Sequence, residues 1–131
     1  MAFQVSPGVQ INEIDATNVI PAVSTSIGGF AGSFNWGPTE EVCLVGSENE
    51  LLEKFGTPDS NTAKYFLTAA AFLKYGNALK VVRVSSGHLN ATADGSGQLV
   101  KNDEDYENNY SGGSLSKGNW VAKYPGVLGN S

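Results

Sequence analysis

The sequence FAGSFNWGP, residues Phe30–Pro38, predicts a β-strand that ends in a tight turn. The rings of Phe30 and Phe34 share one face of this strand, because alternate side chains of a strand point the same way. Gly37 accepts unusual backbone angles, and the proline after it donates no backbone hydrogen bond, so the strand stops here. We therefore expect a core strand over residues 25–34 and a turn directly after it.

Three glycines lie in the first part of this strand, at Gly28, Gly29 and Gly32. Glycine inside a strand indicates that another backbone or a helix approaches closely. A second interpretation is a small α/β ligand-binding module that uses a turn at Gly28–Gly32. No Lys-Ser or Lys-Thr pair follows these glycines, so the pattern lacks the residues of a phosphate-binding loop.

Length and composition restrict the classes of protein to be considered. The 131 residues carry a formal net charge of −5 at pH 7 and a single cysteine, Cys43, within an apolar run. This length allows one modest domain with a core of its own. The acidic balance argues against binding to nucleic acid or to anionic lipid, and no apolar run is long enough to cross a membrane. Cys43 has no partner for an internal disulfide and is expected to be a buried packing residue.

A short strand and a short helix follow the first strand. The apolar run Val42–Val45 predicts the strand. Ser47 and Glu50 predict a capping box, in which the Ser47 hydroxyl accepts from the Glu50 amide while the Glu50 carboxylate reaches back. Gly56 is expected to end this helix.

A second helix and a further strand complete the expected layer. The helix begins near the N-cap candidates of residues 59–62 and runs to about Tyr75, with Gly76 as a left-handed cap. The nearly continuous apolar run Leu79–Val84 predicts a strand that is covered on both faces. The fold class is therefore α/β (α+β), a mixed sheet with two helices packed on it, preceded by an extended N-terminal arm. We expect it to be an incomplete part of a larger multidomain protein.

The ends of this core differ from it in composition. Residues 9–14 alternate between apolar and polar side chains, which predicts a lone strand that pairs at a distance, within this chain or in another, or else a disordered tail. After Ser85 the chain is polar, and residues 86–118 are expected to form a surface loop or insertion. Trp120 to Ala122 resume strand character. The expected divisions are 1–22 (arm and joint), 23–85 (core portion), 86–118 (polar insertion) and 119–131 (return strand of a truncated chain).

The sequence gives little support to an enzyme or a metal protein. His88 is the only histidine, and one histidine with one cysteine does not supply the ligands of a metal site. The carboxylates of residues 103–107 resemble a calcium loop only superficially, because the glycine and the closing glutamate are missing. We therefore expect no catalytic residue, no cofactor and no metal.

Several motifs occur together in a fixed order. They are Ser6-Pro7-Gly8-Val9, Phe30-Ala31-Gly32, Trp36-Gly37-Pro38, Leu52-Glu53-Lys54-Phe55-Gly56, Tyr65-Phe66, Phe72-Leu73-Lys74-Tyr75-Gly76-Asn77, Val81-Val82-Arg83-Val84, Tyr124-Pro125-Gly126 and Gly129-Asn130. In this order and spacing the chain resembles the N-terminal portion of a contractile bacteriophage tail sheath protein.

The resemblance implies a structural subunit of the virion tail rather than an enzyme. Such subunits polymerise as hexameric rings around the tail tube, and contraction drives the tube through the host cell envelope for genome ejection. The implied partners are neighbouring sheath subunits, the tail tube protein, and the baseplate and tail terminator proteins, with assembly in the host cytoplasm. The sheath of a headless injection machine, of the bacteriocin or secretion type, shares the fold and is the alternative.

The resemblance also suggests a role for the lone N-terminal strand. In the family, terminal arms link subunits by adding strands to the sheet of a neighbour, which is what an unpaired strand can do through its main chain. The residues expected to form this inter-subunit arm are Val5, Val9, Gln10, Ile11, Asn12, Glu13 and Ile14. The C-terminal region that completes the core domain in the family is absent from this sequence.

Overall fold

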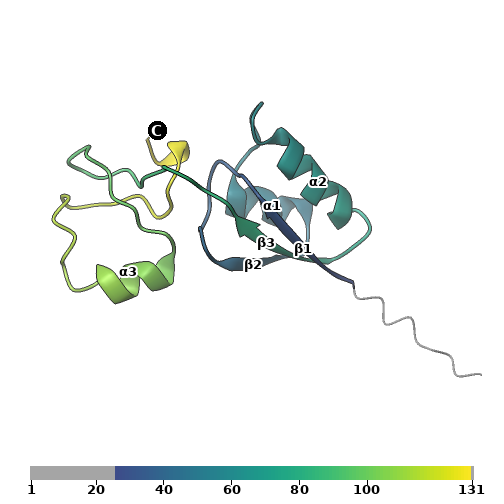
Figure 1. Ribbon diagram of the computed structural model, residues 1–131, viewed down its shortest axis with the longest axis horizontal. Coiled ribbons are helices and arrows are strands. Elements are labelled where there is room, and N and C mark those ends of the chain that lie inside the picture. Colours follow the sequence, from purple (N-terminus) through teal and green to yellow (C-terminus); the bar gives the residue numbers. More distant parts are fainter. Residues whose placement is uncertain (1–25, 131) are drawn as a thin grey trace, which may run out of the picture.

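The computed structural model describes residues 26–130 and shows an α+β fold built on a mixed sheet (Figure 1). In chain order the elements are β1 (Ile27–Gly32), β2 (Val42–Val45), α1 (Glu48–Phe55), α2 (Ala63–Leu73), β3 (Ala78–Arg83), α3 (Asp103–Asn109) and the 3-10 helix η1 (Val127–Asn130). The sheet and the helices α1 and α2 form one unit, here called the sheet unit. Residues 85–130, here called the polar lobe, lie beside it. The mixed sheet and the two helices on it confirm the predicted fold class.

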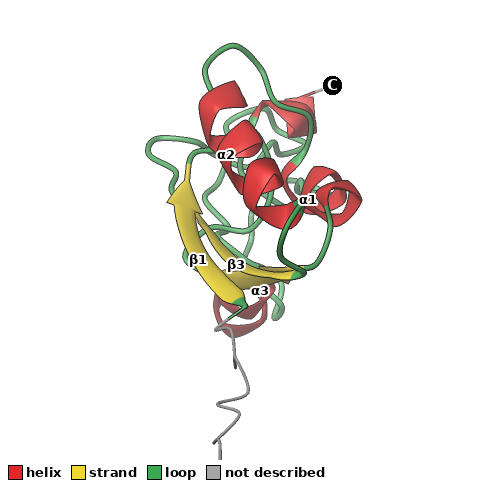
Figure 2. Ribbon diagram, turned by 90° about the vertical axis from the view of Figure 1, so that its right-hand side faces the viewer, coloured by secondary structure: helices red, strands yellow, loops and turns green. Residues whose placement is uncertain are grey.

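The sheet has three strands in the order β1-β3-β2, so the last strand in the sequence lies in the centre. β1 pairs in parallel with β3, from Ile27 opposite Ala78 to Gly32 opposite Arg83. β2 pairs antiparallel with the other side of β3. Helices α1 and α2 lie over the same face of this sheet (Figure 2).

The core lies between the two helices and the inner face of the sheet. Its buried members are Phe34, Cys43, Val45, Leu51, Phe55, Phe66, Ala69, Ala70, Leu79 and Val81. The rings of Phe34 and Phe55 pack with centroids 4.7 Å apart, and Phe30 meets Phe34 edge to face at 6.3 Å. Burying each large apolar side chain contributes about 1.5–3 kcal/mol, so this cluster supplies most of the stability of the unit. The predicted shared face of Phe30 and Phe34 is confirmed.

The first helix begins and ends at the predicted residues. The Ser47 hydroxyl accepts from the Glu50 amide at 3.3 Å, and Gly56 ends the helix with a φ of 75°. The other half of the predicted capping box differs, because the Glu50 carboxylate accepts from the amide of Gly46, at 2.8 Å. A hydrogen bond from Lys54 and this amide hold the pKa of Glu50 below its usual value.

The second helix begins at the predicted N-cap cluster, but its capping bonds and its C-terminal end differ from the prediction. Its N-cap residue, Thr62, makes no side-chain capping bond; instead the Asp59 carboxylate accepts from the amides of Asn61 and Thr62, at 2.9 and 2.8 Å. The helix ends at Leu73, and Gly76 does not have the positive φ expected of a left-handed cap. The Gly76 amide donates to the Phe72 carbonyl at 2.9 Å, so the turn closes without that conformation.

The expectation that the third strand is covered on both faces is wrong. Leu79, Val81 and Arg83 are buried under the helices, whereas Lys80 is exposed on the opposite face. The apolar run Leu79–Val84 wrongly indicated burial on both faces, because it also places valines on the outer face of the sheet, which no described segment covers.

The polar lobe is organised around buried Asn90. Its side-chain amide donates to the Ala122 carbonyl at 2.9 Å, and its side-chain oxygen accepts from the Val100 amide at 2.8 Å. Its backbone also exchanges two hydrogen bonds with Gln98. One side chain thus ties together three segments that are distant in the sequence.

The lobe contains a helix where the sequence analysis expected only a loop. Helix α3 has seven residues, and the Asn102 side chain caps it by accepting from the Asp105 amide at 2.9 Å. Trp120 to Ala122, expected to be a strand, make a single β-bridge at Val121, opposite Thr92. Asn102 is a usual residue type at the start of a helix, but the high content of polar residues around it concealed this signal.

Candidate assembly surface

The outer face of the sheet is apolar and exposed. Ile27 on β1, Val42 and Leu44 on β2, and Val84 just after β3 are 58%, 60%, 55% and 57% exposed. They share one face because alternate residues of paired strands point to the same side of a sheet, with Ile27 near one end of β3 and Val84 at the other. Lys80 is the charged residue within this set, here called the open face. Contiguous apolar patches of this kind mark surfaces at which another protein segment packs.

The outer edge of β1 adjoins this face. β1 hydrogen-bonds with β3 on one side only, and none of residues 26–130 pairs with its other side. Soluble proteins usually protect such an edge with charged residues or proline. The β1 sequence IGGFAG has neither, whereas on β2 the Lys54 ammonium donates to the Leu44 carbonyl at 2.7 Å. β1 is therefore the strand edge at which an added strand meets the least obstruction.

The residues predicted for the inter-subunit arm lie outside the described residues. This applies to Val5, Val9, Gln10, Ile11, Asn12, Glu13 and Ile14. The described residues begin at residue 26, and residues 15–26 separate the predicted arm from β1 in the sequence. The sequence analysis missed the open face, because residues 42–45 are all apolar and do not indicate which of their two faces is covered.

Gly28 and Gly32 of β1 lie against side chains of helix α2 and leave no space for a ligand on that face, whereas Gly29 has nothing within 4 Å. A Cβ atom on Gly28 would lie 2.6 Å from Cζ of Phe72, and one on Gly32 would lie 2.7 Å from Cε1 of Phe30. Both glycines lie within a regular strand rather than in a turn. The interpretation of close helix approach is confirmed, and the proposed ligand-binding turn at Gly28–Gly32 is wrong.

Buried Arg83 joins the sheet unit to the polar lobe. Its Nε donates to the Phe34 carbonyl at 2.9 Å, and its Nη1 donates to the carbonyls of Gly37 and Pro125 at 2.7 and 2.6 Å. Its Nη2 is buried without a hydrogen-bond partner among the described residues. Burial lowers the pKa of Arg83 to about 10, which leaves the guanidinium charged at neutral pH. The predicted turn after β1 is confirmed by the φ of 105° at Gly37.

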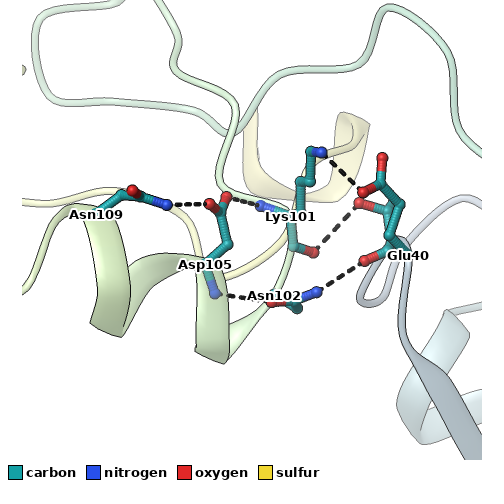
Figure 3. Close-up of polar contacts among 6 residues, drawn as sticks. Glu40, Lys101, Asn102, Asp105 and Asn109 are labelled. Atoms are coloured by element: carbon teal, nitrogen blue, oxygen red, sulfur yellow. Dashed lines mark hydrogen bonds and ion pairs between the residues drawn. The ribbon is translucent and has the colours of Figure 1, made fainter.

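A second set of contacts joins the same two parts at Thr39 and Glu40 (Figure 3). The Thr39 amide donates to the Lys101 carbonyl at 2.9 Å, and the Asn102 side chain donates to the Thr39 carbonyl at 3.1 Å. The Lys101 ammonium pairs with the Glu40 carboxylate at 2.8 Å. Asp105 accepts from the Lys101 amide and from Asn109, so helix α3 is held in the same network. The polar lobe is thus fixed against the turn that follows β1.

Titratable groups do not gather into a reactive cluster in residues 26–130. No group of three or more histidine, cysteine, aspartate or glutamate side chains there could hold a metal ion. His88 Nδ1 lies 2.9 Å from the Ser85 hydroxyl on the surface. Cys43 is buried, and this burial raises the pKa of its thiol. Among the described helices, none is long and apolar enough to span a membrane.

Comparison with known proteins gives a family match over the sheet unit. Residues 25–84 match the family model described as "Tail sheath protein Gp18 domain III N-terminal region". The chain is 41% identical over 78 residues to the tail sheath protein of Enterobacteria phage T4, and 42% identical over 79 residues to that of Vibrio phage KVP40. Each of these matches covers 60% of the chain.

A third relative is matched along nearly the whole chain. The tail sheath protein of Salmonella phage ViI is 38% identical in an alignment of 134 residues that covers 98% of this chain. The chain spans only part of each relative: 12% of the T4 and KVP40 proteins and 20% of the ViI protein. The resemblance stated from the motifs is confirmed by these matches.

Proposed function

This chain is a relative of the bacteriophage tail sheath proteins, and on that premise we propose that it is a structural subunit of a contractile tail sheath. The subunit polymerises as hexameric rings around the tail tube. Contraction of the assembled sheath drives the tube through the host cell envelope for genome ejection. The protein has no enzymatic role in this process.

The observation that carries the proposal is where the family match falls in the structure. All the strands that the structure describes in residues 26–130 lie within the matched range 25–84, and with them the open face and the unprotected edge of β1. An apolar face and a free strand edge are liabilities for a protein that acts alone. They are useful to a protein whose purpose is assembly, because a neighbouring segment covers them.

The occupant that we propose for the edge of β1 is the N-terminal arm of a neighbouring subunit. The arm comprises Val5 and residues 9–14, and its apolar-polar alternation suits a strand with one side on the open face. Strand addition draws its affinity from main-chain hydrogen bonds and its register from alternate side chains. Residues 15–22, polar and containing Pro21, would be the joint that lets the arm stay attached while subunits rearrange.

The remaining partners follow from the same proposal. They are the tail tube protein inside the sheath, and the baseplate and tail terminator proteins at its two ends, with assembly in the host cytoplasm before incorporation into the virion tail. The three relatives named above are phage proteins, which favours a phage tail over a headless injection machine. Residues 86–118 would lie on the outside of the sheath as a surface insertion.

The proposal is tested by electron microscopy of the full-length gene product that contains this sequence, expressed together with its tail tube protein. We expect striated tubes wider than the bare tail tube. A double substitution, Val9→Pro with Ile11→Pro, removes two backbone donors from the arm and should abolish the tubes. The matched control, Val9→Thr with Ile11→Thr, keeps the donors and the strand propensity and should preserve them.

Circular dichroism of the proline variant should be unchanged, because the arm lies outside the sheet unit. Bare tail tubes with dispersed wild-type chain would contradict the sheath assignment. Striated tubes that form equally well with the proline variant would contradict the arm alone.

A further inference from the structure

A cleft lies in the polar lobe between helix α3 and the segment of residues 118–123. Its volume is about 510 Å³, within the range of small-molecule sites. Buried Val100 forms its floor. The ion pair of Lys123 with Asp103, at 3.2 Å, joins the two walls.

Three aromatic side chains line this cleft. Tyr106 lies on α3, and Tyr110 is the residue that caps the C-terminal end of this helix. Trp120 comes from the opposite wall, where its carbonyl accepts from the Ala93 amide at 3.2 Å. Trp120 is 55% exposed and Tyr106 is 41% exposed. These large rings are partly exposed to solvent, and backbone hydrogen bonds hold the residues that carry them. The rings are therefore available to stack on a ligand.

The cleft also presents polar groups without partners. Within residues 26–130 no hydrogen bond involves the Tyr106 hydroxyl, the Asn119 side chain or the Trp120 indole N–H. Together they offer three N–H donors, one amide oxygen that accepts and one hydroxyl that both donates and accepts. The Tyr110 hydroxyl, by contrast, is engaged by Gln98 and the Leu99 carbonyl, which fixes its ring in place.

We propose that this cleft binds a neutral saccharide. A pyranose ring presents an apolar C–H face that stacks on aromatic rings and an equatorial rim of hydroxyls that pair with amide, indole and phenol groups. The acidic first turn of α3 (Asp103, Glu104 and Asp105) disfavours anionic ligands such as phosphates and uronic acids. The proposal is independent of the sheath assignment, since it concerns the polar lobe alone.

The test uses the whole chain and three probes: maltohexaose, chitohexaose and an anionic control, heparin hexasaccharide. The chain has two tryptophans, and Trp36 packs against Tyr124 with ring centroids 5.7 Å apart. Stacking on exposed Trp120 should therefore change the intrinsic fluorescence, and isothermal titration calorimetry should give a dissociation constant for at least one neutral probe. Heparin hexasaccharide should not bind.

Variants decide whether the cleft is responsible. Trp120→Ala should weaken binding by about tenfold or more, because loss of one stacking ring is of that order. Tyr106→Phe keeps the ring and removes the hydroxyl, and should weaken binding about threefold. Tyr75→Ala removes a ring that is 95% exposed in the sheet unit, and should leave binding unchanged.

Two results would overturn the proposal. One is the absence of heat and fluorescence change with both neutral probes at millimolar concentration. The other is binding that survives Trp120→Ala undiminished. Because Trp120 is largely exposed, this variant should keep the wild-type circular dichroism; Trp120→Phe, which retains a ring, gives a second measurement and should bind with intermediate affinity.

Discussion

The sheet unit and the polar lobe are stabilised by different interactions. The hydrophobic cluster draws all its buried members from the sheet unit, between Phe34 and Val81. In the described part of the polar lobe, the buried residues are chiefly Asn90, Thr92, Val100 and Pro125. The first part is held by burial of apolar area, and the second by side chains that bond to backbone. Apolar packing tolerates small changes of shape, whereas a hydrogen-bond hub depends on the particular side chain.

The largest expected effect comes from removing a ring of the sheet unit. Phe55→Ala should lower the free energy of unfolding by about 3–5 kcal/mol, because it leaves a cavity beside Phe34. Guanidinium denaturation followed by circular dichroism measures it. Leu67→Ala, at a site that is 61% exposed on helix α2, is the control and should cost less than about 0.5 kcal/mol. Equal losses in the two variants would show that the cluster does not dominate the stability of this unit.

A smaller effect should follow from cutting the connection between the two parts. Arg83→Met should lower stability by about 3 kcal/mol, because the buried carbonyls of Phe34, Gly37 and Pro125 lose a charged donor. Hydrogen exchange should rise most in residues 118–130, since Pro125 is held from the sheet unit by this side chain.

Lysine at position 83 provides the matched variant. Arg83→Lys keeps the charge but not the planar fork of donors, so it should restore little of the lost stability. Exchange that rises uniformly over both parts in Arg83→Met would contradict the description of Arg83 as a connection between them. It would indicate instead one cooperative unit.

The smallest expected effect is that of acid on a loop of the polar lobe. Asp94 accepts from Thr92 and Ser96, and these hydrogen bonds lower the pKa of its carboxyl to about 2. A carboxyl whose pKa is lower in the folded state than in the unfolded state stabilises the fold at pH values above its ordinary pKa of 3.8. It loses that contribution as the pH falls toward 2. We expect the Ser96 and Gly97 amides to exchange faster at pH 2 than at pH 5, relative to the intrinsic rates. Asp94→Asn should remove this pH dependence; a dependence that persists would assign it to another group.

The sequence predicted the sheet unit better than the polar lobe for a physical reason. Alternation placed Phe30 and Phe34 on one face, and the Ser47 cap and the Gly56 stop are signals within a few residues of each other. Asn90 has partners near Val100 and Ala122, and nothing in its immediate neighbours indicates them. Sequence patterns indicate structure within a few residues, so they do not predict a side chain whose hydrogen-bond partners are distant in the sequence.

The candidate surface was predicted in part for the same reason. Alternation predicted a lone strand at residues 9–14, the resemblance suggested its role as an arm, and both remain predictions. The open face was missed because an apolar run does not reveal whether a second layer covers it. Arg83 gave a signal that was not used: it shares a face with Leu79 and Val81, and a charged residue in that register indicates a buried donor set.

The central position of β3 has a consequence for biosynthesis. β1 and β2 leave the ribosome first, but within residues 26–130 each hydrogen-bonds only with β3, which is translated after both helices. The nascent chain therefore exposes two unpaired apolar strands until residue 83 has emerged, and the parallel pairing then closes a long loop, which slows folding. Throughout that interval the two strands offer binding sites to chaperones and to other nascent chains. Timely translation of β3 thus limits how much of the protein is lost to aggregation.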